Sequence, residues 1–279
     1  MSQHRRSSDF TKFRELFENS KRIVALTGAG VSAECGVPTF RGPGGFWRAY
    51  QATSLATPQA FAADPSLVWQ FYEYRRQLVA TKLPNNAHKT LAYIERQFEG
   101  SDRKLSIVTQ NVDELHRRAG SKNVLEIHGR LFQIRCTKCH TVEDNTDNPI
   151  VPALANVSPI DNDETKNKKI KIEDLPHCKV PSCKALQRPH IVWFNESLDP
   201  QVLEEADRLL SECDMLLVIG TSSIVYPAAM FAPQVAARGV TVAEFNLEPT
   251  SASRTNGYFF EGPCGQTLPR ALGVDENKL

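Results

Sequence analysis

Five short runs of almost uninterrupted apolar residues constrain the fold of this chain more than any other feature of its sequence. They read IVALT (23–27), LSIVT (105–109), NVLEI (123–127), MLLVIG (215–220) and VTVAEF (240–245). Strands that are apolar throughout are typical of parallel sheets, because helices cover both faces. Segments with helical spacing lie at 9–20, 198–212 and 227–238. We therefore predict an α/β fold with a doubly wound, parallel, Rossmann-like sheet.

The bulk composition sets the size of the core and limits the partners. The chain has 279 residues, 41% of them hydrophobic and 23% charged, so one large core, or a core with a smaller appended module, is expected. A formal net charge of +1 predicts no general attraction to nucleic acid or to anionic membranes. No apolar stretch approaches the roughly 20 residues that span a bilayer, and the start MSQHRRSSDF lacks the apolar core of a secretion signal. We expect a monomeric intracellular protein, mitochondrial or cytoplasmic, with the nucleus as an alternative.

The first strand runs directly into a glycine-rich turn. It reads Gly28-Ala29-Gly30-Val31-Ser32-Ala33. Such a G-x-G-x-x-A turn lets the backbone approach a pyrophosphate at the start of a helix. A Rossmann dehydrogenase would continue with a second strand and an acidic residue about 20 positions on, but a segment rich in glycine and proline takes that place. It carries Phe40, Arg41 and Trp47, and we expect it to close over a bound dinucleotide. A structural surface loop is the alternative.

Polar residues follow the other strands where each one ends. The carboxyl ends of parallel strands share one edge of a sheet, and open α/β sheets bind ligands there. These residues are Gln110, Asn111 and Asp113 after the second strand, His128 after the third, Gly220, Thr221 and Ser222 after the fourth, and Asn246 and Glu248 after the fifth. We predict that they line a cofactor site.

Four cysteines interrupt the alternation of helices and strands between about Arg135 and Pro189. They form a C-x2-C pair, Cys136 and Cys139, and a C-x4-C pair, Cys178 and Cys183. Four thiolates are typical of a closed, tetrahedral, structural zinc site. Two neighbouring histidines, His140 and His177, could replace a ligand, and Cys136 to His140 also spells the C-x-x-C-H haem motif, but the second cysteine pair favours zinc.

These patterns predict four parts. A helical segment covers 1–20, a Rossmann-like NAD-binding catalytic domain covers 21–134 and 190–273, a zinc-binding module covers 135–189, and a tail covers 274–279. The lysine-rich run 166–171 is flanked by acids, which is typical of a solvated loop.

Several motifs occur in the order found in sirtuins, the NAD-dependent protein-lysine deacylases. They are GAGVSAECGVPTFRG, TQNVDELH, His128-Gly129, the two cysteine pairs, VWFNESL, GTSSIVYPAA and AEFN, and the resemblance covers residues 20–272. It implies NAD and zinc as cofactors and an acylated lysine of a protein as substrate. It further implies that His128 is the general base, that Asn111 and Asp113 are catalytic beside the nicotinamide ribose, and that Cys264 contacts the cofactor.

Within that family, Ala52, FYEYRR (71–76) and the AAMFAPQVAARGVTVAEFN segment resemble class III, which removes succinyl, malonyl and glutaryl groups. Tyr72 and Arg75 are spaced i, i+3, so on a helix they share a face and can meet one carboxylate. Spacing alone leaves Arg76 as an alternative, and the resemblance selects Arg75. Ala52 is small and leaves room for a longer acyl chain.

The resemblance also implies a set of contacts to the substrate peptide, which would bind as an added strand. Its members are Val192, Phe194, Glu196 and Tyr226. Two positions depart from the class III pattern: Cys35 stands in place of serine, and Asn195 stands in place of glycine.

The implied reaction transfers the acyl group to ADP-ribose and releases nicotinamide, with weak activity on acetyl-lysine. A histidine suits the role of base because its reference pKa is about 6.5. The alternatives are an NAD-dependent deacetylase, an ADP-ribosyltransferase, a Rossmann oxidoreductase, and a zinc-bearing module that binds acylated proteins without turnover.

Overall fold

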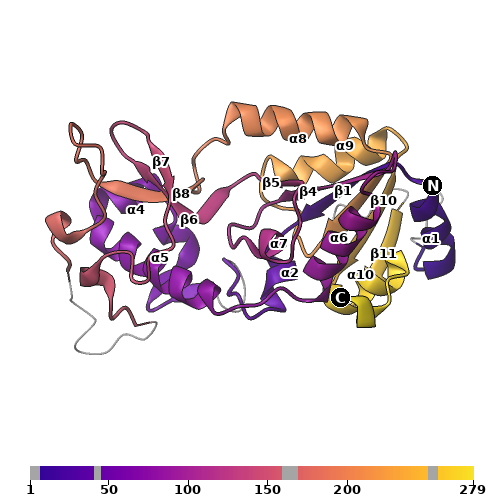
Figure 1. Cartoon of the computed structure of the whole chain (residues 1–279), viewed down its shortest axis with the longest axis horizontal. Helices are drawn as coiled ribbons and strands as arrows, with labels where there is room; N and C mark the ends of the chain where they lie inside the picture. Colours follow the sequence, from indigo (N-terminus) through magenta and orange to yellow (C-terminus); the bar gives the residue numbers. More distant parts are fainter. Residues whose placement is uncertain (1–6, 41–44, 159–168, 251–256) are drawn as a thin grey trace. The chain divides into compact units, whose positions relative to one another are not determined.

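The computed structural model describes residues 7–40, 45–158, 169–250 and 257–279 (Figure 1). The chain forms two compact units. Unit 1 comprises the described parts of 1–36, 83–127 and 199–279, and unit 2 those of 37–82 and 128–198. The domain boundaries given above stay a prediction. Arg41 and the first half of the lysine-rich run lie outside the described residues.

Unit 1 is built on a six-stranded sheet in which every neighbouring pair of strands is parallel. In spatial order the strands are β11 (Gly257–Glu261), β10 (Thr241–Asn246), β9 (Met215–Ile219), β1 (Arg22–Thr27), β4 (Lys104–Thr109) and β5 (Val124–Glu126). The predicted fold class is confirmed. Strand β11 was not predicted, because this edge strand is only partly buried and lacks a continuous apolar run.

The strand order contains one switch point. From β1 the chain proceeds outward through β4 and β5, and it later returns to the other side of β1 and continues through β9, β10 and β11. The connections that follow β1 and β9 therefore lead in opposite directions. In open α/β sheets the ligand site lies at such a point.

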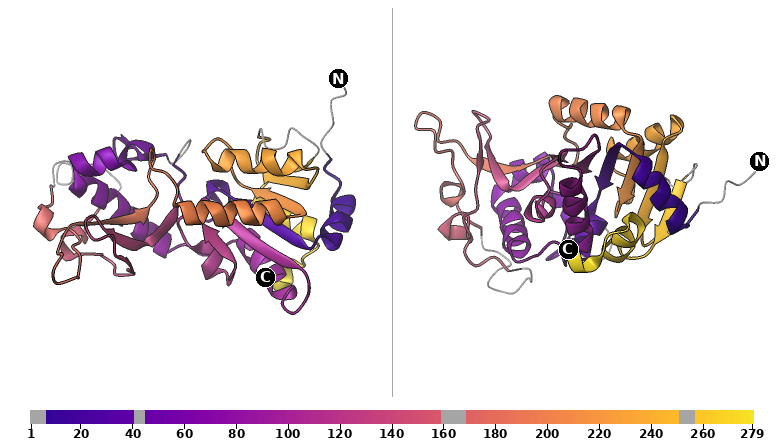
Figure 2. Two further views of the ribbon diagram at one scale, coloured as in Figure 1. Left: turned by 90° about the horizontal axis from the view of Figure 1, so that it is seen from above. Right: turned by 45° about the vertical axis from the view of Figure 1, so that its right-hand side comes forward.

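Helices cover both faces of this sheet (Figures 1 and 2). On one face lie α1 (Phe10–Asn19), α6 (Asn86–Gln97) and α10 (Cys264–Leu272), and on the other lie α8 (Pro200–Glu212) and α9 (Phe231–Ala237). Alternate strand residues such as Ile23 and Ala25 join the core beneath the first set. Phe13 of α1 packs 5.1 Å from Phe260 between ring centroids, which anchors the helix predicted at 9–20. Two short helices, α2 (Ala29–Ala33) and α7 (Leu115–Arg118), follow β1 and β4.

Unit 2 combines helices with a small antiparallel sheet. The helices are α3 (Ala52–Leu55), α4 (Pro58–Ala63) and α5 (Pro65–Ala80), and the sheet has the order β7 (Val142–Asp144), β6 (Gly129–Cys136), β8 (Gln187–Ile191). A two-stranded hairpin, β2 (Phe46–Trp47) and β3 (Tyr50–Gln51), precedes α3. This hairpin was not predicted, because it lies in the segment that is rich in glycine and proline.

Helix α5 is the central element of unit 2. It begins at Pro65, because Asp64 caps it by accepting a hydrogen bond from the backbone N–H of Leu67 at 3.0 Å. Trp69 is fully buried and donates its Nε1–H to the carbonyl of Gln187 in β8, at 2.9 Å. The helix is therefore fixed directly to the antiparallel sheet.

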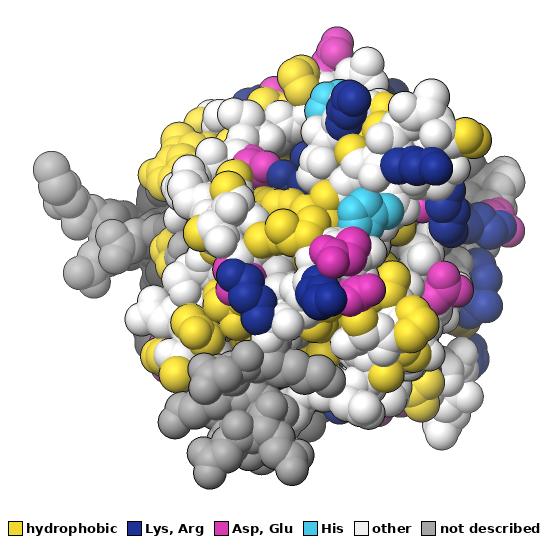
Figure 3. Space-filling model, turned by 90° about the vertical axis from the view of Figure 1, so that its left-hand side faces the viewer, with side chains coloured by type: hydrophobic (Ala, Val, Ile, Leu, Met, Phe, Trp, Pro, Cys, Tyr) yellow, Lys and Arg dark blue, Asp and Glu magenta, His cyan; other side chains and the backbone are white. Residues whose placement is uncertain are grey.

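The surface carries charges of both signs. Figure 3 shows one face of the molecule, where Lys and Arg side chains intermingle with Asp, Glu and hydrophobic ones. Among the helices that the structure describes, none combines the length and the apolar character needed to cross a membrane.

Candidate active site

Two glycine-bearing loops interlock at the switch point of unit 1. The backbone N–H of Gly28 donates to Ile219, and that of Gly30 donates to Gly220 at 2.7 Å. A Cβ on Gly28 would lie 2.7 Å from the Cβ of Thr221, and one on Gly30 would lie 2.7 Å from the Gly220 carbonyl oxygen. Neither loop can therefore carry a side chain where the two meet. The contact leaves only backbone and small side chains at this edge, which fits the close approach of a dinucleotide's phosphates.

Asn111 ties the end of β4 to the first glycine loop. It is 8% exposed, and its Nδ2 donates to the Gly28 carbonyl at 3.0 Å and to Ser32 Oγ at 2.9 Å. The neighbouring Gln110 donates to Thr221 Oγ1 at 3.0 Å in the second loop. Five residues predicted separately from the sequence are thus brought together.

A buried cluster of polar side chains, Thr27, Thr109 and His116, is hydrogen-bonded to the backbone of Asn111. Thr27 Oγ1 donates to Thr109 Oγ1 at 2.7 Å, and Thr109 in turn accepts the backbone N–H of Asn111 at 3.1 Å. The Thr27 hydroxyl proton is used in this bond. His116 Nε2 lies 2.9 Å from Thr27 Oγ1 and must therefore be the donor in the bond between His116 and Thr27. Burial lowers the pKa of His116 to about 3. Burial, and next the neighbouring His116 ring at 4.7 Å, hold the pKa of His88 well below its usual value.

The remaining predicted cofactor residues of unit 1 differ in exposure. Asp113 is buried and accepts the backbone N–H of Leu115 at 2.9 Å at the start of α7, whereas Ser222 and Glu248 are exposed. Asn246 donates to the Thr221 carbonyl at 2.9 Å.

Two further buried groups of unit 1 are the Cys264 thiol and the Glu244 carboxyl group. Burial, and next the charge of Glu34, raise the pKa of the Cys264 thiol to about 12, so this thiol stays protonated. Glu244 is fully buried in β10 and accepts the backbone N–H of Thr250 at 3.1 Å. Glu244 was not predicted, and its only signal in the sequence is a single acid within an apolar strand.

In unit 2, His128 stands immediately before β6. Its carbonyl accepts the backbone N–H of Val192 at 2.9 Å, so the predicted base and one predicted substrate residue share a backbone link. The following Gly129 has φ +81°, and a Cβ there would overlap the carbonyl of His190. Only glycine allows this turn, which explains the His-Gly pair in the sequence.

The predicted acyl-binding pair is buried in α5. Tyr72 is fully buried and Arg75 is 6% exposed. Arg75 donates to the Pro38 carbonyl, and its guanidinium lies 4.3 Å from the centroid of the Phe40 ring. Burial raises the pKa of Tyr72, although the nearby charge of Arg75 partly opposes this, so the phenol keeps its proton.

The alternative, Arg76, is committed elsewhere. It donates to the backbone carbonyls of Leu131, Asn145 and Asp147 at 2.8–3.1 Å and lies 3.7 Å from the Glu73 carboxylate. Burial raises the pKa of Glu73. This network fixes α5 to β6 and to the segment after β7. Arg76 therefore links α5 to the rest of unit 2, which favours Arg75 as the acyl-binding arginine, and the selection of Arg75 stays a prediction.

Aromatic side chains surround this pair. Phe40 meets Phe71 and Phe194 edge to face, with centroids 6.4 and 6.2 Å apart. Trp47 is 3% exposed and packs 5.7 Å from Phe71. Ala52 is 2% exposed at the start of α3. The surroundings of the Arg75 guanidinium are therefore aromatic and apolar.

The segment predicted to hold the peptide follows β8. Phe194 donates its backbone N–H to the Ala56 carbonyl at 2.9 Å. Glu196 accepts hydrogen bonds from Arg188 at 2.6 and 2.9 Å. Although burial alone would raise it, these bonds hold the pKa of Glu196 below its usual value. Asn195 has φ +69°, the conformation that glycine adopts most easily and asparagine tolerates, which accounts for this departure.

Two other positions singled out from the sequence are Tyr226 and Cys35. Tyr226, in unit 1, is 73% exposed. The second departure, Cys35, lies with its Sγ 4.0 Å from His88 Nδ1, and burial raises the pKa of its thiol. A raised pKa keeps a thiol protonated and lowers its reactivity.

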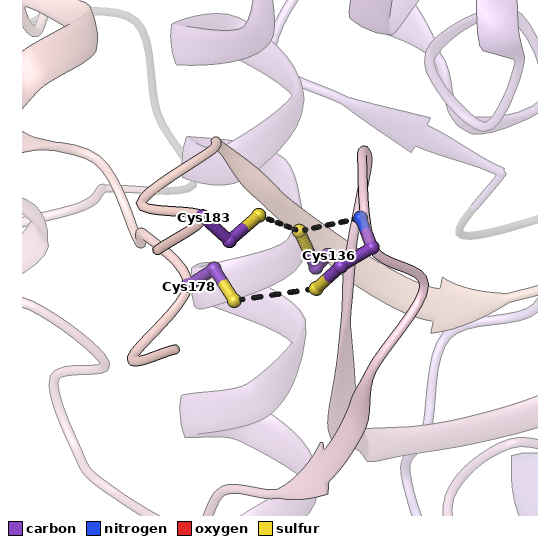
Figure 4. A group of neighbouring side chains, drawn as sticks. Cys136, Cys178 and Cys183 are labelled. Atoms are coloured by element: carbon purple, nitrogen blue, oxygen red, sulfur yellow. Dashed lines mark hydrogen bonds between the residues drawn. The ribbon is translucent and has the colours of Figure 1, made fainter. Parts of the chain in front are cut away.

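The four cysteines of unit 2 form one cluster (Figure 4). Their sulfur atoms lie within 4.8 Å of one another, with 3.5 Å between Cys136 and Cys183 and 3.6 Å between Cys139 and Cys178. A tetrahedral zinc ion with Zn–S bonds of about 2.3 Å would place its ligands about 3.8 Å apart, so the cluster fits zinc. Hydrogen bonds from Thr141 lower the pKa of the Cys139 thiol to about 6, which favours the thiolate.

The two histidines beside the cluster take no part in it. His140 is exposed, and His177 Nδ1 lies 2.7 Å from the carbonyl of Leu175. Since the second cysteine pair completes a four-sulfur set, the haem alternative is not supported.

Comparison with known proteins agrees with this geometry. The Sir2 family model matches residues 28–227. The mitochondrial NAD-dependent protein deacylase sirtuin-5 of Danio rerio is 57% identical over 98% of this chain and 90% of its own length, and that of Canis lupus familiaris is 56% identical over 98% and 87%. The crystal structure of a Sir2 homologue in complex with NAD superposes with a TM-score of 0.81 at 37% identity, covering 97% of this chain and 96% of the other. The chain belongs to the Sir2 family and is of the sirtuin-5 type.

Proposed function

We propose that this chain is an NAD-dependent protein deacylase that removes succinyl, malonyl and glutaryl groups from lysine side chains, with weaker activity on acetyl-lysine. The observation that carries the acyl preference is the burial of Tyr72 and Arg75 on one face of α5, while Arg76 is committed to backbone carbonyls. Sirtuin-5 relatives more than 50% identical over nearly the whole chain support the reaction class.

The residues at the switch point of unit 1 would hold NAD. The backbone of Gly28 to Gly30 would bind the phosphates, and the loop from Gly220 to Ser222 would bind phosphate or ribose oxygens. Asn246 and Glu248 would bind the hydroxyls of the adenosine. Phe40 and Trp47 would exclude water from the bound dinucleotide, and Arg41 would pair with phosphate. When bound, NAD supplies a ribose carbon that becomes electrophilic as nicotinamide leaves and that accepts the acyl oxygen.

Asn111, Asp113 and His128 would act on the reacting groups. Asn111 is held rigidly by its bonds to Gly28 and Ser32, so it can orient a ribose hydroxyl or a water without reorganising. Asp113 would stabilise positive charge that develops nearby. His128 would accept a proton from a ribose hydroxyl, a role that contributes about 10²–10⁴ in rate.

The acyl pocket would distinguish acidic from neutral chains. A charge-assisted hydrogen bond contributes about 1.5–3 kcal/mol. Each such bond, from the Tyr72 hydroxyl or the Arg75 guanidinium, would favour a succinyl over an acetyl group by about tenfold to a hundredfold or more, since about 1.4 kcal/mol corresponds to a factor of ten.

The protein substrate would bind through its backbone. We expect an extended peptide to add as a strand beside 192–194 and Tyr226, with Glu196 supporting this segment. Backbone bonds dominate such binding, so the preference for particular sequences would be modest. The proposed locations are the mitochondrion and the cytoplasm, with the protein monomeric.

A peptide panel tests the proposal. One lysine peptide is prepared with succinyl, glutaryl, malonyl or acetyl groups, and mass spectrometry follows deacylation with and without NAD. We expect NAD-dependent release of nicotinamide and faster turnover of the acidic acyl groups. Equal rates on all four peptides would contradict the acyl preference, and labelled ADP-ribose retained on the protein would favour the ADP-ribosyltransferase alternative.

Two variants separate catalysis from acyl recognition. His128→Tyr should reduce turnover of every peptide at least 10²-fold without loss of fold. Arg75→Met should raise KM for succinyl-lysine far more than for acetyl-lysine. Near-normal turnover by the first variant, or equal effects of the second on both substrates, would remove the residue concerned from its proposed role.

A further inference from the structure

One hydrogen bond in unit 2 has a direction that the chemistry of its partners fixes. Trp193 is 2% exposed, and its Nε1–H lies 2.8 Å from Oη of the fully buried Tyr72. An indole N–H can only donate. The Tyr72 oxygen is therefore the acceptor of this bond, and its own O–H must point away from Trp193.

The Tyr72 proton is left available by this arrangement. Among the residues that the structure describes, Trp193 is the only hydrogen-bond partner of Tyr72. Because burial raises the pKa of the phenol, the proton stays on the oxygen at neutral pH. A buried hydroxyl donor without an acceptor is unfavourable in a folded protein, so it is poised to meet an acceptor that a ligand brings.

Packing holds the indole in this orientation. The Trp193 ring lies 5.3 Å from Phe61 between centroids, and the guanidinium of Arg188 lies 3.4 Å from the Trp193 centroid. Glu196 pairs with Arg188 at 2.6 Å and also accepts the backbone N–H of Trp193 at 2.8 Å. Both the ring and the backbone of Trp193 are therefore fixed, and the donated hydrogen bond cannot easily be redirected.

We propose that Trp193 is a positioning residue for acyl specificity, which holds the Tyr72 hydroxyl as a donor toward the carboxylate of an acidic acyl chain. The inference rests on the proposed function and deepens it. Without the Trp193 N–H, the Tyr72 hydroxyl could rotate and would no longer be held as a donor toward that carboxylate. An acetyl group offers no carboxylate to this donor, so Trp193 acts on the preference between acidic and neutral chains.

The test is Trp193→Phe, which removes the N–H and keeps an aromatic ring against Phe61 and Arg188. We expect the succinyl-to-acetyl ratio of kcat/KM to fall about 3- to 10-fold, mainly through a higher KM for the succinyl peptide, as for the loss of one neutral hydrogen bond. An equal fall on both peptides would overturn the inference.

Trp69→Phe is the matched control. Trp69 is also buried in unit 2 and also donates its indole N–H, but to the Gln187 carbonyl. This variant should lower the thermal stability of the protein without changing the succinyl-to-acetyl ratio. The same ratio change in both tryptophan variants would show that general loosening of unit 2, and not the bond to Tyr72, is responsible.

A double-mutant cycle with Tyr72→Phe gives a readout that a merely structural role would not move. Since Trp193 acts through the Tyr72 hydroxyl, Trp193→Phe should change the ratio no further once that hydroxyl is absent. Additive effects would overturn the inference. If Trp193→Phe does not fold by circular dichroism, benzothienylalanine at position 193, which replaces the N–H by sulfur at nearly the same shape, serves in the cycle.

The outcomes separate this inference from the proposed function. If the wild-type protein shows no preference for succinyl over acetyl peptide, the proposed acyl preference fails and the inference fails with it. If the wild-type preference is present and Tyr72→Phe reduces it, but the Trp193 variants leave it unchanged, the inference alone is wrong.

Discussion

In unit 1 the interior is formed by strands that are apolar on both faces, and helices on each side bury residues such as Leu217 and Val218 completely. Unit 2 has a smaller sheet, and much of its cohesion comes from specific polar links: four thiols in one cluster and a buried arginine that reaches three carbonyls. The first kind of core tolerates many apolar substitutions, whereas the second depends on individual atoms. Unit 2 should therefore unfold before unit 1, and single substitutions should be enough to destabilise it.

The largest effect should come from removing one zinc ligand. Structural zinc contributes on the order of 10–16 kcal/mol to a small module, so Cys136→Ser should unfold unit 2. All three tryptophans, Trp47, Trp69 and Trp193, lie in unit 2, so their fluorescence reports on that unit alone. We expect red-shifted fluorescence, while hydrogen exchange in the β1 and β9 peptides stays slow. Native fluorescence in the variant, or in chelator-treated protein, would contradict a structural zinc site.

The next largest effect should come from the buried arginine. Arg76→Met would leave the Glu73 carboxylate buried without its counter-charge and three carbonyls without a donor, which should cost about 3–5 kcal/mol in unfolding free energy. Arg208→Met is the matched control in unit 1, because Arg208 is half exposed on α8 and pairs with Glu205 and Glu212. The control should cost less than about 1 kcal/mol. Urea denaturation checks both, and equal losses would mean that the two units do not differ as described.

Unit 1 contains a buried pair of histidines, His88 and His116, which should make its stability depend on pH. Their folded-state pKa values are lowered, so the unfolded chain takes up protons that the folded chain refuses once the pH falls below about 6.5. Stability should be unaffected by this pair above that pH and should fall by up to about 1.4 kcal/mol per pH unit for each histidine, down to about pH 3 for His116. Hydrogen exchange of the α6 peptide between pH 7.5 and 5, corrected for intrinsic rates, measures it. A flat profile would contradict the burial of neutral rings.

The smallest effect concerns Asn195. At φ +69°, Asn195→Gly should change the unfolding free energy by less than about 1 kcal/mol, since the relief of strain and the extra freedom of the unfolded chain oppose each other. Asn195→Ala should cost about 1–2 kcal/mol. If alanine were as stable as asparagine in a thermal melt, the left-handed backbone would not account for this departure from the family's glycine.

The two units differ in how much of their structure the sequence predicts, and the reason is physical. The strands of unit 1 were predictable because a strand covered on both faces must be apolar throughout, and only the edge strand β11 and the buried Glu244 were missed. In unit 2 the cysteine spacing predicted the cluster. The contacts of Arg76 could not be predicted, because backbone carbonyls leave no mark on the sequence.

The candidate site shows the same limit. The i, i+3 spacing placed Tyr72 and Arg75 on one face but could not exclude Arg76. The structure adds that Arg76 donates to three backbone carbonyls, which the spacing could not show. The donor from Trp193 to Tyr72 joins residues 121 positions apart. No periodicity reports such a pair.

The interlocked loops at the switch point also bear on how such a protein can diversify. A methyl group added at Gly30 would collide with the backbone of Gly220, and one added at Gly220 would collide with Gly30 and Val31. A side chain at either glycine therefore requires a compensating change in the other loop. A related protein that binds a bulkier nucleotide would need changes in both loops together.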